Sequence, residues 1–596
     1  MVAEALPRWN MSSVFPSLDS QEYIDAVARY DQSIAQMEER FDAAGIRRTE
    51  ALPWTDAVRE AADSALAQWN ELLERQRVLM AYTHCFVACD SRDELAQAKL
   101  SELSGREPRI GALIARFTGW IGAIDVEQWI AQSPLAADHA FAIRKQKTQA
   151  SKMMSEPEEI LASELGQYGG RAWSRFYGNF SSQIMVTIHR EGKTETIPMS
   201  MARNLAFDPD RNVREAAYHA ELDAWKANAL PIAAAMNSLK GATMHLAKKR
   251  GWGDPLNAAL FENHIDRETL DAMMGAARRA FPDFRRFYKA KAKALGLSRL
   301  TWYDLYAPVG ASKREWSWDE AVRFVAEGFA DYSDKLSRFA RRSSDEGWID
   351  AEPRPGKRDG AFCTGIQRDE SRVFMNFKPS FLSVSTLAHE LGHAYHNVCL
   401  ANRTPLQRQT PMCLAETASI FCETIIQNAA LRDADRDEQL MILDGALERS
   451  SGVTVDITSR FIFEQTVMAK RQDRELSAQE MCQIMREAQL DTYGDGLDPD
   501  CLHEYAWAAK PHYYGSTYYN YPYMFGLLFG LGLYALYQKD PEPFRDAYDD
   551  LLSSTGLDDA QTLANRYGFD LKSPAFWEAS LDFVRRDIDR FVELVG

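Results

Sequence analysis

Cysteine is scarce in this sequence, and its spacing gives no sign of a thiolate metal site. Eight cysteines occur in 596 residues, and none forms a Cys-x-x-Cys pair. A sparse, unpaired set of this kind is typical of proteins kept in a reducing compartment. Met1 to Ser20 also lacks a basic start followed by an apolar run, so no secretory signal is predicted. We therefore expect a cytoplasmic protein.

Basic residues are outnumbered, and long apolar runs are rare. Lys and Arg total 69 against 86 Asp and Glu, which gives a formal net charge of −17. This surplus of negative charge argues against nucleic acid as a partner. One extended apolar run, Tyr521 to Tyr537, is at or below the short limit for a membrane-spanning helix and is dense in glycine and tyrosine. We predict a buried core helix there and no membrane partner.

A chain of 596 residues is too long for one ordinary core, and its 46% hydrophobic and 26% charged residues are typical of globular proteins. Apolar residues recur at helical intervals over Ser20 to Ala44 and Asp56 to Leu103. Alternating apolar residues around Glu191-Gly192-Lys193 predict a β-hairpin within Gln183 to Ser200. We predict two domains: an N-terminal helical domain, 1–200, with this small hairpin near its end, and a catalytic domain, 201–596.

Histidine is also rare, yet two histidines stand four residues apart in His389-Glu390-Leu391-Gly392-His393. With 11 histidines in the chain, chance would supply on the order of 0.01–0.02 His-Glu-x-x-His matches. Residues four apart share one face of a helix, so both imidazoles can bind a single zinc ion. Glu390 can reach a water activated by that zinc and act as its base. The alternative is a helix with two histidines and no metal.

A hydrolytic zinc requires a third protein ligand, and the next helix-like segment offers two candidates. Glu416 and Glu423 lie about two turns apart and so share a face. We predict Glu416 as the ligand because it comes first after the connecting loop, and Glu423 as a carboxylate that orients a ligating imidazole. A surface or capping role is the alternative for Glu423. His396 is expected in the core or supporting a ligand, and Cys399 excludes the third histidine of a metzincin.

Two short strands are predicted just before the motif, over 360–363 and 371–377. A strand edge beside a zinc helix can hold an extended peptide by backbone hydrogen bonds. An ordinary buried strand is the equally weighted alternative. The candidate substrate-binding residues are Gly360, Ala361, Phe362, Phe374 and Asn376.

Six tyrosines and one histidine fall within the twelve residues from His512 to Tyr523. Peptide hydrolysis develops negative charge on the former carbonyl oxygen, and neutral tyrosine or histidine donors can stabilise it. A core aromatic cluster remains the alternative for some of these rings. Gly515 is a candidate flexible point for closure on a substrate.

Taken together, these segments resemble the zinc oligopeptidases that include thimet oligopeptidase and, more closely, oligoendopeptidase F. The resemblance rests on TLAHELGHAYH around His389, on ETASIFCE beginning at Glu416, and on the segment from His512 that ends YYNYPYMFG. It implies a mainly α fold: a helical ellipsoid with a deep substrate channel, zincin-type active-site helices and a small β-sheet near the zinc. It also implies that the apolar run after Tyr521 is a buried helix.

The resemblance further implies one catalytic zinc and short peptides as substrates. Position by position, His389, His393 and Glu416 match the family's metal ligands, and Glu390 matches its catalytic base. His512 matches the histidine among the family's oxyanion donors, and the candidates for its tyrosines are Tyr519, Tyr521 and Tyr523. Which tyrosine faces the oxyanion stays open.

We therefore expect a zinc metalloendopeptidase that hydrolyses internal bonds of short peptides. A zinc exopeptidase and a peptide-binding protein with a structural zinc are the alternatives, and no oligomeric state is predicted.

Overall fold

The computed structural model describes residues 6–190, 192–312 and 314–596. Residues 1–5 of the N-terminal stretch and Glu191 in the predicted hairpin turn lie outside the described residues. Helices dominate the described part of the chain and its strands form two small sheets, which confirms the mainly α class. The Cα positions group the chain into two compact units. Unit 1 comprises residues 1–153, 314–429 and 537–567, and unit 2 comprises residues 154–313, 430–536 and 568–596. This grouping does not test the predicted domains 1–200 and 201–596, which stay a prediction.

Unit 1 contains an N-terminal set of helices, a three-stranded sheet and the helices that follow it. Its elements are α1 (Gln21–Ala43), α2 (Asp56–Cys89), α3 (Glu94–Ser104), α4 (Glu107–Ile121), α5 (Val126–Gln132), α6 (Pro134–Asp138), α7 (Ala140–Ser151), α14 (Trp318–Tyr332), α15 (Asp334–Asp345), β3 (Ile349–Asp350), β4 (Phe362–Gln367), β5 (Glu370–Phe374), α16 (Phe381–Cys399), α17 (Met412–Ala415), most of α18 (Thr417–Asp433), α25 (Pro541–Ser553) and α26 (Ala560–Arg566).

Unit 2 contains a hairpin and a set of longer helices. Its elements are α8 (Glu156–Tyr168), α9 (Gly170–Ser182), β1 (Met185–Arg190), β2 (Lys193–Pro198), α10 (Met199–Asn204), η1 (Leu205–Phe207), α11 (Arg211–Lys249), α12 (Pro255–Glu262), α13 (Arg267–Ala294), η2 (Trp302–Asp304), α19 (Arg436–Ser451), η3 (Gly452–Asp456), α20 (Ile457–Arg471), α21 (Ala478–Tyr493), η4 (Gly494–Gly496), α22 (Ala506–Ala509), α23 (His512–Gly515), most of α24 (Tyr521–Lys539) and α27 (Pro574–Val595).

The helices predicted at the N-terminus are present, with one interruption. The stretch Ser20 to Ala44 forms α1, whose core face includes Tyr23 and Phe41. The stretch Asp56 to Leu103 is split into α2 and α3 by a turn at residues 90–93. The physical reason is local, because aspartate favours turns and helix caps, and the Asp93 side chain accepts a hydrogen bond from the backbone of Ala96.

The sheet of unit 1 lies against the helix that carries the histidine motif. Its strand order is β3–β5–β4, with β5 parallel to β3 and antiparallel to β4. Both β4 and β5 contact α16. The central strand β5 is buried along Ser371–Phe374, whereas β4 is the edge strand predicted before the motif.

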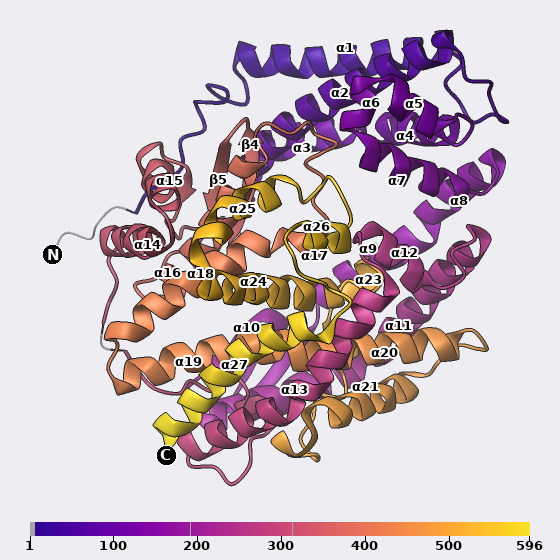
Figure 1. The fold of residues 1–596 in the computed structure, drawn as a ribbon. Coiled ribbons are helices and arrows are strands. Elements are labelled where there is room, and N and C mark those ends of the chain that lie inside the picture. The colour runs from indigo at the N-terminus through magenta and orange to yellow at the C-terminus, as the bar shows by residue number, and fades with distance from the viewer. Residues whose placement is uncertain (1–5, 191, 313) are drawn as a thin grey trace. The chain divides into compact units, whose positions relative to one another are not determined.

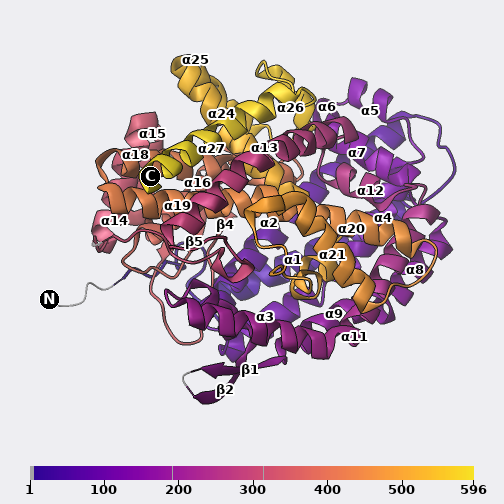
Figure 2. The same ribbon diagram turned by 90° about the horizontal axis from the view of Figure 1, so that it is seen from below.

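In unit 2, segments far apart in sequence lie side by side. The C-terminal helix α27 runs along α13 (Figure 1). The predicted hairpin is confirmed as β1–β2, which pairs Met185 with Pro198 and lies against α11 (Figure 2). The apolar run after Tyr521 forms α24 and is buried along most of its length, as predicted. None of the helices in the described part of the chain combines the length and apolarity that a membrane span needs.

Candidate metal centre

Helix α16 presents both motif histidines on one face, as the four-residue spacing predicts. The helix is strongly apolar, and Leu387, Ala388 and Leu391 fix its orientation in the core of unit 1. The two imidazole centroids lie 4.9 Å apart with their planes at 81°. The side chains of His389 and His393 keep 25% and 23% exposure, so both rings can be reached from outside the core.

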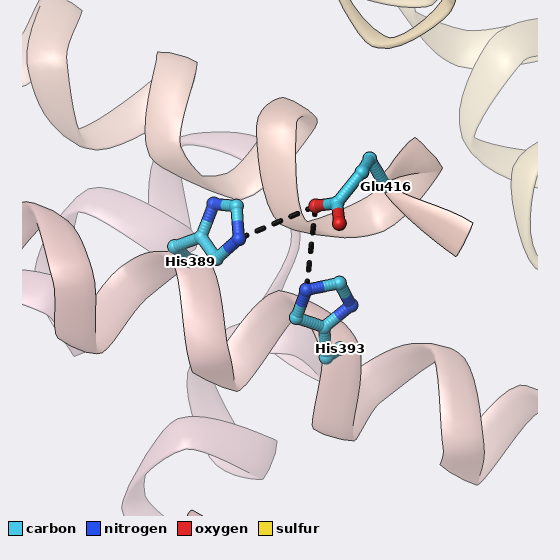
Figure 3. A group of neighbouring side chains, drawn as sticks. All are labelled: His389, His393 and Glu416. Carbon is cyan, nitrogen blue, oxygen red and sulfur yellow. Dashed lines mark ion pairs between the residues drawn. The ribbon is translucent and has the colours of Figure 1, made fainter. Parts of the chain in front are cut away.

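Glu416 points between the two imidazoles from the junction of α17 and α18 (Figure 3). Its Oε2 lies 3.3 Å from His389 Nε2 and 3.4 Å from His393 Nε2. One ligand atom from each of the three residues lies within 4.8 Å of the others. The Ser419 hydroxyl donates to the same Oε2 at 2.7 Å and so holds the carboxylate in place. The sequence did not point us to Ser419, although its position one turn after Glu416 was a usable signal.

The charges of this cluster suit a cation. Burial alone would raise the pKa of Glu416, but the two imidazoles outweigh it and hold that pKa well below its usual range. Burial likewise opposes charge on His389, yet Glu416 and Glu423 raise the pKa of this imidazole to about 10. Two imidazole nitrogens and one carboxylate oxygen are a set of protein ligands found in hydrolytic zinc sites. The residues present therefore fit a zinc ion.

Glu423 supports the first histidine from the side opposite the ligand atom. Its Oε2 lies 3.2 Å from His389 Nδ1, and its Oε1 accepts a hydrogen bond from the Ser385 hydroxyl at 2.9 Å. A carboxylate on Nδ1 fixes the tautomer that leaves Nε2 free to bind metal. This geometry supports the predicted orienting role of Glu423.

Glu390 is set apart from the ligands by its surroundings. Its side chain is buried, and its Oε2 has no hydrogen-bond partner among the described residues. Burial raises the pKa of this carboxyl group above its ordinary value. A buried carboxylate oxygen without a partner is costly, and such groups concentrate at functional sites.

Gly392, inside the motif, allows α16 and α18 to approach closely. A Cβ at this position would lie 2.6 Å from both Ala418 O and Ser419 Cα. Those atoms belong to backbone, which has little room to shift. The glycine therefore sets the distance between the two histidines and the segment that carries Glu416.

We expect Gly392→Ala to weaken metal binding and to destabilise the protein by about 1–3 kcal/mol, because the added methyl overpacks the helix contact. Gly111→Ala is the matched control, since Gly111 lies in α4 with no heavy atom within 4 Å of the added Cβ. That control should be neutral or slightly stabilising. Thermal unfolding and zinc titration of both variants measure the difference. Equal zinc affinity in the two variants would contradict the role given to Gly392.

His396 and Cys399 do not join the cluster. The His396 ring is buried, and its Nε2 lies 3.1 Å from Leu552 O and 2.9 Å from Thr555 Oγ1. Burial lowers the pKa of this imidazole to about 4. Of the two roles predicted for His396, these contacts favour the core one, because Leu552 and Thr555 engage its Nε2.

The predicted substrate-binding residues differ in accessibility. Phe374 is fully buried and stacks on Phe362 at 4.8 Å, so its side chain belongs to the core and does not line a peptide site. This corrects the prediction for Phe374. The residue lies in the central strand β5 and its side chain faces the core, which explains its burial. Asn376 donates to the backbone oxygens of Arg358 and Gly360 and holds the loop before β4. Ala361 precedes edge strand β4, and peptide binding there stays a prediction.

The tyrosine-rich segment of unit 2 separates into buried and half-buried rings. Tyr513 and Tyr514 are packed in the core, and Tyr514 donates to Trp507 O. Tyr521 is also buried, and its hydroxyl donates to Ala259 O of α12 at 3.1 Å. Core packing thus accounts for these three rings. A core aromatic cluster was the alternative to oxyanion donors for some rings of the segment.

His512, Tyr519 and Tyr523 form the half-buried group of this segment. The three ring centroids lie 5.6–5.9 Å from one another, with His512 and Tyr519 stacked at 17°. Burial first, and then the nearby Arg460 and Lys510, lower the pKa of His512. Its imidazole is therefore neutral at neutral pH and can donate a hydrogen bond without carrying charge.

A mainly helical fold with a His-His-Glu cluster and a buried glutamate beside it defines a class, the helical metallopeptidases. A family model described as "Peptidase family M3" matches residues 204–583, and another described as "Oligopeptidase F" matches residues 121–185. The chain belongs to peptidase family M3, and it is a peptidase.

The chain is similar along most of its length to curated members of this group. It is 23% identical over 540 residues to Oligopeptidase PepF of Bacillus subtilis (strain 168), which covers 89% of this chain and 80% of that protein. It is 22% identical over 554 residues to an oligoendopeptidase F homolog of Lactococcus lactis subsp. lactis (strain IL1403), covering 90% and 91%. The crystal structure of oligoendopeptidase-F from Enterococcus faecium shares the fold, with a TM-score of 0.69, 17% identity and coverage of 96% and 99%.

Proposed function

We propose that this peptidase is a zinc-dependent endopeptidase that hydrolyses internal bonds of short peptides. The observation that carries the proposal is Glu390, a buried carboxylate with an unpartnered oxygen directly beside a three-residue cluster suited to zinc. The names of the relatives, oligopeptidase and oligoendopeptidase, support short peptides as the substrates.

His389, His393 and Glu416 would hold the zinc ion, with Glu423 and Ser419 fixing two of these side chains. When bound, zinc supplies Lewis acidity, which makes a water acidic near neutral pH and polarises a peptide carbonyl.

Glu390 carries the proton through the reaction. It accepts one proton from the attacking water at Oε2 while the hydroxyl oxygen adds to the carbonyl carbon. It then delivers the same proton to the departing nitrogen as the C–N bond breaks, so that a carboxylic acid and an amine are released. The raised pKa of Glu390 makes it a stronger base and so favours the first of these two proton transfers.

His512, Tyr519 and Tyr523 are the proposed hydrogen-bond donors to the oxyanion. Their support is the half-buried ring group and the neutral imidazole of His512. Tyr521, the third tyrosine predicted for this role, is a weaker candidate because its hydroxyl already donates to Ala259 O. Each donor aimed at a developing oxyanion contributes about 2.7–4 kcal/mol in other hydrolases.

A peptide-binding protein with a structural zinc is the alternative from another class. A closed structural site has four protein ligands and requires no base. The cluster found among the described residues has three ligands, and Glu390 sits beside it, which favours hydrolysis.

Digestion of a mixed pool of short peptides, followed by mass spectrometry, tests the proposal. We expect internal cuts in the zinc-loaded sample, complete loss of products after chelation, and their return when zinc is restored. Products that persist unchanged in the chelated sample would refute zinc dependence. Adding copies of the same peptides blocked at both ends separates the endopeptidase from the exopeptidase alternative, since an exopeptidase leaves them uncut.

A further inference from the structure

A fully buried ion pair lies beneath the tyrosine-rich segment of unit 2. Lys240 of α11 and Glu464 of α20 meet at 2.6 Å, with side chains only 2% and 1% exposed. Removing two charges from water is costly, and an apolar pair of similar size is often as stable or more so. Stability alone is therefore a weak explanation for this pair, and its other contacts indicate what it does.

Among the described residues, every further side-chain hydrogen bond of the pair goes to residues 516–520. Glu464 Oε1 accepts from the backbone N–H of Tyr518 at 3.1 Å, and Glu464 Oε2 accepts from Asn520 Nδ2 at 3.4 Å. Lys240 Nζ donates to Ser516 O at 3.4 Å. Two side chains, one from α11 and one from α20, thus hold this short loop through three hydrogen bonds.

The central residue of this loop has a strained backbone. Tyr518 has φ of +53°, one of three non-glycine residues with positive φ among the described residues. For a bulky residue this conformation costs roughly 1–2 kcal/mol and persists only where surrounding contacts impose it. The N–H bond to Glu464 is such a contact, and burial of the Tyr518 ring against Phe461 is another.

The strained turn determines where the next residue points. Tyr518 is buried, whereas Tyr519 is half-buried and stacks on His512 at 5.8 Å. Tyr523, in the first turn of α24, completes the ring group at 5.6 Å from Tyr519. If the loop relaxed to negative φ at Tyr518, the Tyr519 ring would leave this arrangement.

We propose that Glu464, with Lys240 as its counter-ion, is a positioning residue that holds Tyr519 against His512 for catalysis. The inference rests on the proposed function, because it acts through the oxyanion donors. Glu464 itself touches no substrate in this account. It acts by imposing the turn at Tyr518.

The test compares Glu464→Gln with Asp444→Asn. Asp444 is also a buried carboxylate paired with a buried lysine, Lys291, but within the described part of the chain it forms no hydrogen bond or ion pair with residues 512–523. With the best-cleaved peptide of the pool as substrate, we expect Glu464→Gln to lower kcat about 10–100-fold, because small misplacement of a catalytic donor is costly. KM should change less than about threefold, since an oxyanion donor acts in the transition state. Asp444→Asn should leave kcat near the wild-type value.

Hydrogen exchange at the Tyr518 amide gives a readout that does not depend on activity. We expect this amide to exchange at least about tenfold faster in Glu464→Gln than in wild type or Asp444→Asn, because its acceptor is weakened. Unchanged exchange would overturn the proposal even if the protein cleaved no peptide.

The double variant Lys240→Met with Glu464→Leu separates positioning from stability. An apolar pair leaves no unpaired buried charge, so this double variant should be more stable than Glu464→Leu alone, which leaves Lys240 buried without its counter-ion. The kcat of the double variant should nevertheless stay low, because the Tyr518 N–H has lost its acceptor. A stable double variant with wild-type kcat would overturn the proposal. A wild-type protein that cleaves no peptide would instead refute the proposed function.

Discussion

Glu390→Gln is expected to lower kcat/KM for peptide cleavage by about 10²–10⁴-fold while zinc content stays at the wild-type level. The amide keeps the shape of the side chain but binds no proton at neutral pH, so neither half of the proton transfer can proceed. The measurement is steady-state cleavage of a short peptide, with metal analysis of the same preparation.

The same substitution should not destabilise the fold, which separates lost chemistry from lost structure. Glu390 is buried with one unpartnered carboxylate oxygen, and burial already raises its pKa. A neutral amide avoids the desolvation cost of the charge, so the melting temperature should equal or exceed that of wild type. Retention of zinc together with a normal cleavage rate would show that Glu390 is not the base.

Loss of a zinc ligand is the second substitution for which we expect a large effect on zinc binding and peptide cleavage. Glu416→Ala removes the oxygen that faces both imidazoles, and we expect it to abolish stoichiometric zinc binding and all measurable cleavage. Glu423→Gln removes only the partner of His389 Nδ1, and should weaken zinc binding about 10–100-fold. Zinc titration of the two variants measures this gradation.

The relative loss of zinc affinity in these two variants shows which carboxylate binds the metal and which one orients a ligand. Full zinc affinity in Glu416→Ala with loss in Glu423→Gln would exchange the roles of the two carboxylates. Excess zinc should restore cleavage in Glu423→Gln, because its ligand set is complete, and should fail to restore it in Glu416→Ala.

The local sequence pattern was enough for predictions that depend on residue spacing within one helix. His389, His393 and Glu390 could be arranged from the sequence because a helix fixes which residues share a face. The family resemblance is confirmed by the match to peptidase family M3. The hairpin β1–β2 and the core helix α24 were predicted from alternation and from apolar length in the same way.

Features set by contacts between distant segments could not be predicted in this way. Burial of Phe374 depends on β5 being the central strand, and the order of strands in a sheet cannot be predicted from the sequence of one strand. The hydroxyl of Tyr521 is engaged by α12, more than 250 residues earlier in the chain. The contacts of Lys240 and Glu464 with the loop at Tyr518 join three segments that lie far apart in the sequence.

The central claim is that one zinc at His389, His393 and Glu416 makes this chain an endopeptidase. The most direct test is to strip the protein of metal and titrate it with zinc while measuring cleavage of a peptide blocked at both ends. We expect no cleavage without zinc and a rate that rises to a plateau at one zinc per chain, with the cut inside the peptide. Cleavage of the blocked peptide at the full rate by the metal-free protein would contradict the account.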